Sequence, residues 1–180
     1  MATVRAGSRG ALVVVDVQAG VVASAWEADR VVGNIARAVE RARAAGVPVV
    51  WVQHQDDELV PHTPPWQWVP ELVPADGEAR VQKEYNSSFE KTSLDDELGR
   101  LGVSHVALAG AATNWCIRAT AYAALERGYD VTLLDDAHTT DSEAAAAVVD
   151  DLNTVMRWVS YADVSNTAVP AGELDFASLA

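Results

Sequence analysis

Three side chains that could together perform acyl transfer stand at the ends of strand-like segments. Asp16 follows the run Ala11–Val15, Lys83 ends the run Ala79–Lys83, and Cys116 opens a helix-like segment after a fourth run. A thiol in the first turn of a helix is close to unpaired backbone N–H groups and to the positive end of the helix dipole, and both favour the thiolate. A nearby lysine would favour it further, and a carboxylate could accept its proton. These residue types therefore supply a nucleophile, a base and electrostatic support.

Each of the three residues also has a structural interpretation. A lone cysteine is more often a buried hydrophobic side chain than a catalyst. Asp16 could cap the loop after its strand, and Lys83 could be a solvated strand end. These interpretations weaken when all three residues share the carboxyl edge of one parallel sheet, because ligands bind at that edge.

The segments that carry these residues predict a six-stranded, mostly parallel sheet in a three-layer α/β/α arrangement. Apolar β-branched runs alternate with helix-like segments, as in a doubly wound sheet with right-handed crossovers. We expect a single domain over residues 1–180, with its core at about 11–160 and a tail at 161–180 that packs on a neighbour. The strands are expected at Ala11–Val15, Val49–Gln53, Ala79–Lys83, His105–Ala109, Val131–Leu134 and Val155–Val159. Helices are expected from Val31 to Ala42 and at Ser93–Leu101, Asn114–Arg127 and Ser142–Asn153.

The amino-acid composition limits which binding partners and which cellular compartment are expected. The chain has 180 residues, 49% of them hydrophobic, which is typical of a soluble globular protein. A formal net charge of −13 disfavours nucleic acid, and neither a basic cluster nor a long apolar run indicates a membrane. Met1–Gly10 lacks the apolar stretch of a secretory signal, so we expect a cytoplasmic protein. The single cysteine excludes an internal disulfide and a multi-cysteine metal site.

Three segments together resemble the isochorismatase-like cysteine hydrolase superfamily, over nearly the whole chain. They are VVVDVQ around Asp16, VQKEYNSSF around Lys83, and GAATNWCIRATAYAALERGYDVTLLDDA around Cys116. The resemblance implies a Rossmann-like six-stranded parallel sheet, frequent oligomers and a catalytic triad at these three positions. It also implies a cis peptide bond between Ala111 and Ala112, and an oxyanion hole formed by the N–H groups of Ala112 and Cys116.

From this resemblance we expect hydrolysis of a C–N bond in a small-molecule amide, with no cofactor. Asp16 would take the thiol proton while Lys83 tunes both groups, and the sulfur of Cys116 would attack the carbonyl. Asp16 would then protonate the departing amine and activate the water that hydrolyses the thioester.

Two related activities divide the superfamily. Nicotinamidases carry a metal on an Asp-x-His pattern after the second strand, whereas this chain has the reverse order, His54-Gln55-Asp56, with His62 further on. Polar residues on a surface loop are the favoured interpretation, so no metal is expected. Isochorismatases hydrolyse a vinyl ether without a thiol nucleophile. Cys116 therefore favours C–N hydrolysis and leaves vinyl-ether hydrolysis as the alternative.

Aromatic residues near the triad are candidates for the pocket wall. We expect Tyr85 and Trp115 to line it, because each is close in sequence to a triad member, and Gln18 to form hydrogen bonds around Asp16. His105 and His138 are expected to be structural.

The segment from His54 to Asp76 is rich in proline and tryptophan, and a loop of this length is usually functional. Its tryptophans, Trp66 and Trp68, would expose apolar surface, which suggests a homo-oligomer, either a dimer or a tetramer.

Other classes of protein fit less well. A phosphoryl-transfer enzyme with a nucleophilic Asp16 would need an acidic residue two positions on, where this chain has Gln18. A dinucleotide site would need a glycine-rich first turn, and only Gly20 is present there. A non-catalytic oligomeric binding protein on the same scaffold stays open.

Overall fold

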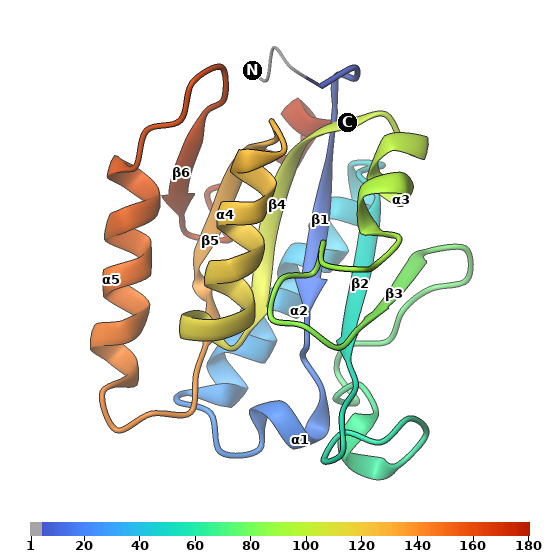
Figure 1. Cartoon of the computed structure of the whole chain (residues 1–180), viewed down its shortest axis with the longest axis vertical. Helices are drawn as coiled ribbons and strands as arrows, with labels where there is room; N and C mark the ends of the chain where they lie inside the picture. The colour runs from blue at the N-terminus through green and yellow to red at the C-terminus, as the bar shows by residue number, and fades with distance from the viewer. Residues whose placement is uncertain (1–4) are drawn as a thin grey trace.

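The protein is built on one sheet of parallel strands in the order β3-β2-β1-β4-β5-β6. The computed structural model describes residues 5–180, so part of the prediction for Met1–Gly10 lies outside the described residues. Every adjacent pair of strands is parallel, which confirms the predicted doubly wound α/β sheet (Figure 1). The strands are β1 Arg9–Val15, β2 Val49–His54, β3 Ala79–Lys83, β4 Val103–Ala111, β5 Asp130–Thr139 and β6 Asn166–Val169.

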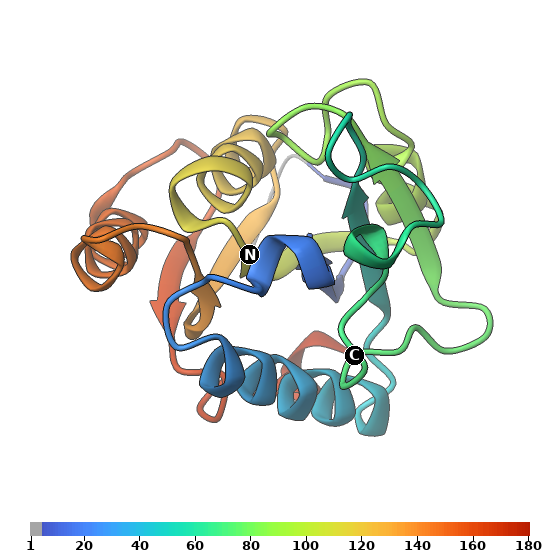
Figure 2. The ribbon, with the colours of Figure 1, turned by 90° about the horizontal axis from the view of Figure 1, so that it is seen from below.

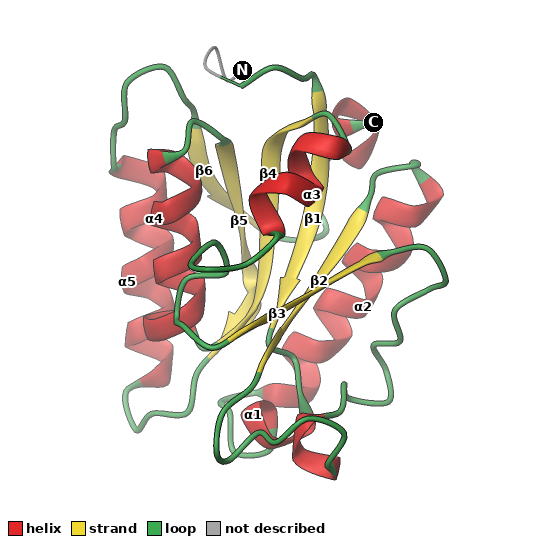
Figure 3. Cartoon of the chain, turned by 45° about the vertical axis from the view of Figure 1, so that its right-hand side comes forward, coloured by secondary structure: helices red, strands yellow, loops and turns green. Residues whose placement is uncertain are grey.

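Helices cover both faces of the sheet. Figure 2 shows α2 on one side of the sheet and α4 and α5 on the other, and Figure 3 shows that α3 lies on the same side as α4 and α5. The helices are α1 Ala19–Val22, α2 Ala28–Ala44, α3 Leu94–Arg100, α4 Arg118–Glu126 and α5 Ala145–Trp158. Single turns of other helix types occur at η1 Pro64–Trp66, η2 Thr113–Ile117 and η3 Phe176–Leu179.

The apolar run of β1 explains the two cores. Successive side chains of a strand point to opposite faces, so Val13 and Val15 pack under α3, α4 and α5 while Leu12 and Val14 pack against α2. A strand that is buried on both faces is continuously apolar, as its sequence is.

The topological switch point of the sheet lies between β1 and β4. The first three strands extend one way from β1, and β4 then pairs with the other side of β1. The two backbones come very close there, because a Cβ atom on Gly110 would lie 2.0 Å from the carbonyl oxygen of Val15. Parallel sheets bind ligands at such a switch point.

The sixth strand differs from the prediction. Val155–Val159 was expected to be a strand, but α5 extends through Trp158 and β6 is Asn166–Val169. The buried side chains Val149, Leu152 and Met156 recur at helical spacing, which outweighs the β-branched residues between them.

The last twenty residues are also not a tail. Asn166 pairs with Val131 of β5, so this segment completes the sheet. Phe176 and Leu179 are buried in the core beneath β1 and α2. The segment therefore packs on its own sheet.

The tryptophans of the long loop after β2 lie largely inside the protein. Trp66 is buried, and Trp68 packs edge-on against Trp51 with the ring centroids 5.4 Å apart. The argument for an oligomer from their exposure is therefore wrong. The large apolar side chains that are exposed include Trp158 at 81% and Trp115 at 59%. Within residues 5–180, none of the helices combines the length and the apolar character that a bilayer span requires.

Candidate active site

Asp16, Lys83 and Cys116 meet above the carboxyl ends of the strands. Lys83 Nζ lies 2.7 Å from Asp16 Oδ2 and 3.2 Å from Cys116 Sγ. Asp16 and Lys83 are buried, whereas Cys116 is partly buried. The strand order separates β3 from β1 by β2, so the lysine side chain must cross the end of β2 to reach Asp16.

Asp16 turns away from the sheet immediately after β1. Its φ is +52°, in the left-handed region that aspartate adopts more readily than most residues. Its N–H still donates to Val52 O at 2.9 Å, which ties the residue to the end of β2. The backbone thus directs the carboxylate across the sheet edge.

Cys116 lies in a single wide turn after β4. The peptide bond between Ala111 and Ala112 is cis, as the sequence resemblance implied, and the turn Thr113–Ile117 has π-helical geometry. The carbonyl oxygen of Ala112 accepts from the N–H groups of Trp115 and Ile117, at 3.1 Å each. Within the described residues, no protein group accepts from the Ala112 N–H.

A buried chain of hydrogen bonds ties this turn to α5. Asn153 Nδ2 donates to Asp135 O, which leaves Asn153 Oδ1 to accept from His138 Nε2 at 2.8 Å. His138 Nδ1 is then the bare ring nitrogen, and the hydroxyl of Thr113 donates to it at 2.9 Å. Burial lowers the pKa of His138 to about 4, so the ring is neutral.

Burial dominates the titration of the two acidic groups in the site. It raises the pKa of Asp16 above its usual value, and the positive charge of Lys83 offsets only part of the rise. It also raises the pKa of Cys116 to about 12, assisted by the negative charge of Asp16 and opposed by Lys83. The thiol is therefore protonated at neutral pH.

The expectation that the surroundings of Cys116 favour the thiolate is wrong for the resting protein. The cost of desolvation and the nearby carboxylate outweigh the lysine and the helix end. Any reaction at the sulfur would therefore need a base to remove the thiol proton. The raised pKa of Asp16 makes it a stronger base than an exposed aspartate.

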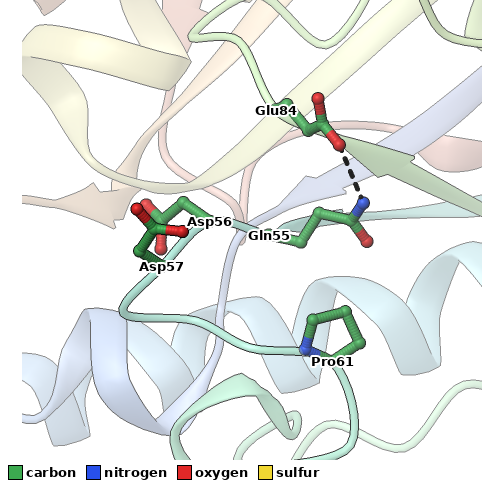
Figure 4. A pocket seen from close by; sticks show the side chains of 5 residues that line it. All are labelled: Gln55, Asp56, Asp57, Pro61 and Glu84. Carbon is green, nitrogen blue, oxygen red and sulfur yellow. Dashed lines mark hydrogen bonds between the residues drawn. The ribbon is translucent and has the colours of Figure 1, made fainter.

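Two cavities with shared lining residues lie near the triad, and Lys83 lines one of them. One of about 430 Å³ is lined by Gln55, Asp56, Asp57, Pro61 and Glu84, as Figure 4 shows. The other, of about 440 Å³, is lined by Gln55, Gln82, Lys83, Glu84, Tyr85 and Lys91. The two share Gln55 and Glu84, whose side chains are joined by a hydrogen bond of 3.1 Å. The cavity that Lys83 lines thus adjoins a second cavity whose charged lining residues are all acidic.

Of the three residues that were expected to line the pocket or to contact Asp16, one lines a cavity, one is exposed and one is buried. Tyr85 is part of the cavity beside Lys83, and its hydroxyl accepts from Lys91 at 2.8 Å. Trp115 is exposed next to Cys116. Gln18 is fully buried, and its side chain bonds to the backbone of His54 and Trp66 instead of Asp16.

His54 is the neighbour of the triad whose role the sequence did not suggest. Its Nδ1 lies 3.2 Å from Lys83 Nζ, and its Nε2 lies 3.1 Å from Asp56 Oδ2. The available signal was its place at the end of β2, between the two strands that end in Asp16 and Lys83.

The residues considered as metal ligands do not converge. His62 packs against Trp66, with the ring centroids 5.3 Å apart, while His54 and Asp56 contact each other. In the part of the chain that the structure describes, no three histidine, cysteine, aspartate or glutamate side chains are grouped as a metal site requires.

Comparisons with known proteins place this geometry in a wider context. The model of the isochorismatase domain family matches residues 10–169. Streptothricin hydrolase from Streptomyces noursei is 40% identical over 154 residues, which cover 81% of this chain and 61% of that protein. Ureidoacrylate amidohydrolase RutB from Methylobacterium radiotolerans is 30% identical over 193 aligned residues, covering 83% and 75%.

Solved structures agree with these sequence comparisons. The crystal structure of an isochorismatase from Pseudomonas putida KT2440 superposes with a TM-score of 0.82 at 26% identity, covering 93% of this chain and 91% of that one. The chain spans only 61% and 53% of the lengths of the two streptothricin hydrolases that it matches.

Proposed function

Because this chain belongs to the isochorismatase family, we propose that it hydrolyses a C–N bond of a small amide through a covalent intermediate on Cys116. The observation that carries the proposal is the position of one buried lysine. Lys83 Nζ is within contact distance of both the carboxylate of Asp16 and the sulfur of Cys116. These are the groups that must exchange a proton before the sulfur can attack a carbonyl carbon.

The first half of the reaction forms the acyl-enzyme. Asp16 accepts the thiol proton as the sulfur of Cys116 bonds to the amide carbon. The tetrahedral oxyanion accepts hydrogen bonds from the N–H groups of Ala112 and Cys116. Protonated Asp16 then gives its proton to the leaving nitrogen, the C–N bond breaks, and a thioester remains.

The second half of the reaction releases the acid. Asp16, ionised again, removes a proton from water, and the resulting nucleophile attacks the thioester carbon. The C–S bond then breaks, and Asp16 returns its proton to the sulfur. Lys83 stays charged throughout and stabilises whichever of its two partners carries negative charge.

The relatives support an amide as the substrate class. One of them is named as a hydrolase of streptothricin and another as an amidohydrolase of ureidoacrylate. The cavity that adjoins the one lined by Lys83 adds a constraint on charge, because Asp56, Asp57 and Glu84 line it. Such a lining favours neutral or cationic molecules over anions.

Vinyl-ether hydrolysis is the second candidate, since the raised pKa of Asp16 would also suit an acid that protonates an alkene. That reaction needs no thiol nucleophile, so it does not explain why Cys116 lies beside Lys83. Its substrate, isochorismate, carries two carboxylates, and the acidic lining would repel them.

The test is a screen for released ammonia or amine over small amides, ureas and lactams, with streptothricin, ureidoacrylate and isochorismate included. We expect turnover of an amide that is lost in Cys116→Ala, together with an acyl adduct on Cys116 detectable by mass spectrometry. Isochorismate cleavage that survives Cys116→Ala, without turnover of any amide, would refute the proposal.

A further inference from the structure

His54 is held rigidly at the end of β2, beside the triad lysine. It is the register partner of Lys83 in the pairing of β2 with β3. The fully buried side chain of Gln18 accepts from its backbone N–H at 2.8 Å and donates to its carbonyl oxygen at 2.9 Å. The backbone from which the imidazole ring extends is therefore fixed by the sheet and by Gln18.

The contacts of the ring assign its tautomer. An ammonium group only donates, so His54 Nδ1 accepts from Lys83 Nζ at 3.2 Å. A neutral imidazole that accepts at Nδ1 carries its proton at Nε2. This proton is directed to Asp56 Oδ2 at 3.1 Å.

Asp56 is prepared for that contact by its own backbone. Its Oδ1 accepts from the N–H groups of Leu59 at 2.7 Å and Glu58 at 2.9 Å. The bond from Leu59 contributes most to lowering the pKa of Asp56, so its carboxylate is ionised. The carboxylate polarises the imidazole ring of His54, which makes Nδ1 a better acceptor for Lys83.

The surroundings of Lys83 change during acylation. Its Nζ has four neighbours, because the carbonyl oxygen of Tyr85 lies 3.1 Å away in addition to Asp16, Cys116 and His54. When Asp16 takes the thiol proton, Lys83 loses its anionic neighbour, because the resting thiol is already uncharged and Asp16 stays neutral until it protonates the leaving nitrogen. A buried ammonium group without strong acceptors is costly.

We propose that His54 and Asp56 are positioning residues that keep the Lys83 ammonium in place while Asp16 is protonated and carries no charge. The proposal rests on the proposed function of the triad. His54 Nδ1 and Tyr85 O are the acceptors that remain while Asp16 holds the thiol proton, and of the two only His54 is strengthened by an adjoining carboxylate.

The variants separate this role from packing. His54→Leu removes both ring nitrogens, whereas His54→Asn keeps an acceptor near the position of Nδ1. Asp56→Ala removes the polarising charge. His105→Leu is the matched control, because His105, like His54, is a partly buried histidine at a strand. Its side chain contacts Thr132 of β5 and no residue of the triad.

The first readout needs no substrate. Alkylation by iodoacetamide makes the same change at sulfur as acylation, and the chain has a single cysteine, so mass spectrometry reports Cys116 alone. We expect alkylation of His54→Leu to be about ten- to a hundredfold slower than that of the original protein, the usual effect of losing a hydrogen bond to a charged group. Asp56→Ala should show a smaller loss, and His54→Asn should recover most of the rate.

The second readout is steady-state turnover of the amide found in the screen. In His54→Leu, kcat should fall by a similar factor while KM stays within about threefold, because the contact matters most after the substrate has bound. Thermal unfolding establishes that each variant is folded, and His105→Leu should retain the original rates.

Lys83→Met separates failure of this proposal from failure of the proposed function. If alkylation is slow in Lys83→Met but unchanged in His54→Leu, His54 has no positioning role and the triad stands. Equal losses in His54→Leu and His54→Asn would also overturn the positioning role, because packing would then explain both. Alkylation of Lys83→Met at the original rate would show that the lysine does not activate the thiol at all, which refutes the triad itself.

Discussion

Replacing Asp16 by asparagine should make the thiol of Cys116 more acidic while abolishing turnover. The negative charge of Asp16 is one cause of the raised pKa of Cys116, and Lys83 acts in the opposite direction. Asparagine keeps the shape of the side chain but removes the charge, so Lys83 would act on the sulfur without its counterion. The base that the reaction needs would be lost at the same time.

The size of the effect follows from the contact distances. Asp16 and Cys116 contact the same ammonium group at 2.7 and 3.2 Å. Two charges about 4 Å apart interact by about 4 kcal/mol at an effective dielectric constant of about 20, equivalent to a thousandfold change in acid dissociation. Water screens part of this interaction at the partly buried sulfur, so we expect about ten- to a hundredfold. Loss of a general base lowers kcat by about a hundredfold or more.

The thiolate can be titrated by its ultraviolet absorbance, with each Cys116→Ala counterpart as the blank. The original protein should show no thiolate signal at neutral or mildly alkaline pH, because the pKa of Cys116 is about 12. Asp16→Asn should show the signal at lower pH. A titration in Asp16→Asn that is unchanged or shifted upward would refute the electrostatic reasoning, and retained turnover would refute the assignment of Asp16 as the base.

Three further predictions concern the framework of the site. The pKa of His138 is lowered to about 4, so below about pH 6.5 the unfolded chain binds a proton that the folded chain does not. The free energy of unfolding, obtained from thermal unfolding at each pH, should therefore fall by up to about 3 kcal/mol between pH 6.5 and pH 4. His138→Gln should lose this dependence on pH. Thr113→Val leaves His138 Nδ1 without its donor and should cost about 1–3 kcal/mol in chemical denaturation, whereas Thr113→Ser should restore it. Gly110→Ala should fail to give soluble folded protein by circular dichroism, because its Cβ would lie 2.0 Å from Val15 O, whereas Gly46→Ala, where a Cβ meets nothing within 4 Å, should fold with a small loss of stability.

The strand ends were predictable because they depend on local patterns. A continuous apolar run such as Ala11–Val15 can only be buried on both faces, and the residue that follows it must lie at the sheet edge. Lys83 was predicted to end a short strand-like segment, Ala79–Lys83, and it does end β3. The sixth strand was not predictable in this way, because Met156 belongs both to the segment Val155–Val159 that was expected to be a strand and to the buried helical repeat of α5.

The amino-acid sequence by itself determined which groups reach the carboxyl edge: Asp16, Lys83 and Cys116 each follow or end an element whose type is set by its own residues. Only the tertiary structure decided how those groups behave. The strand order makes Lys83 cross β2 and so brings His54 to its Nζ, a contact between residues 29 positions apart. Burial, which depends on every packed element, then keeps the thiol protonated where local helix arguments favour the thiolate. Pairing across the sheet and desolvation are properties of the folded chain, and for that reason local sequence patterns do not contain them.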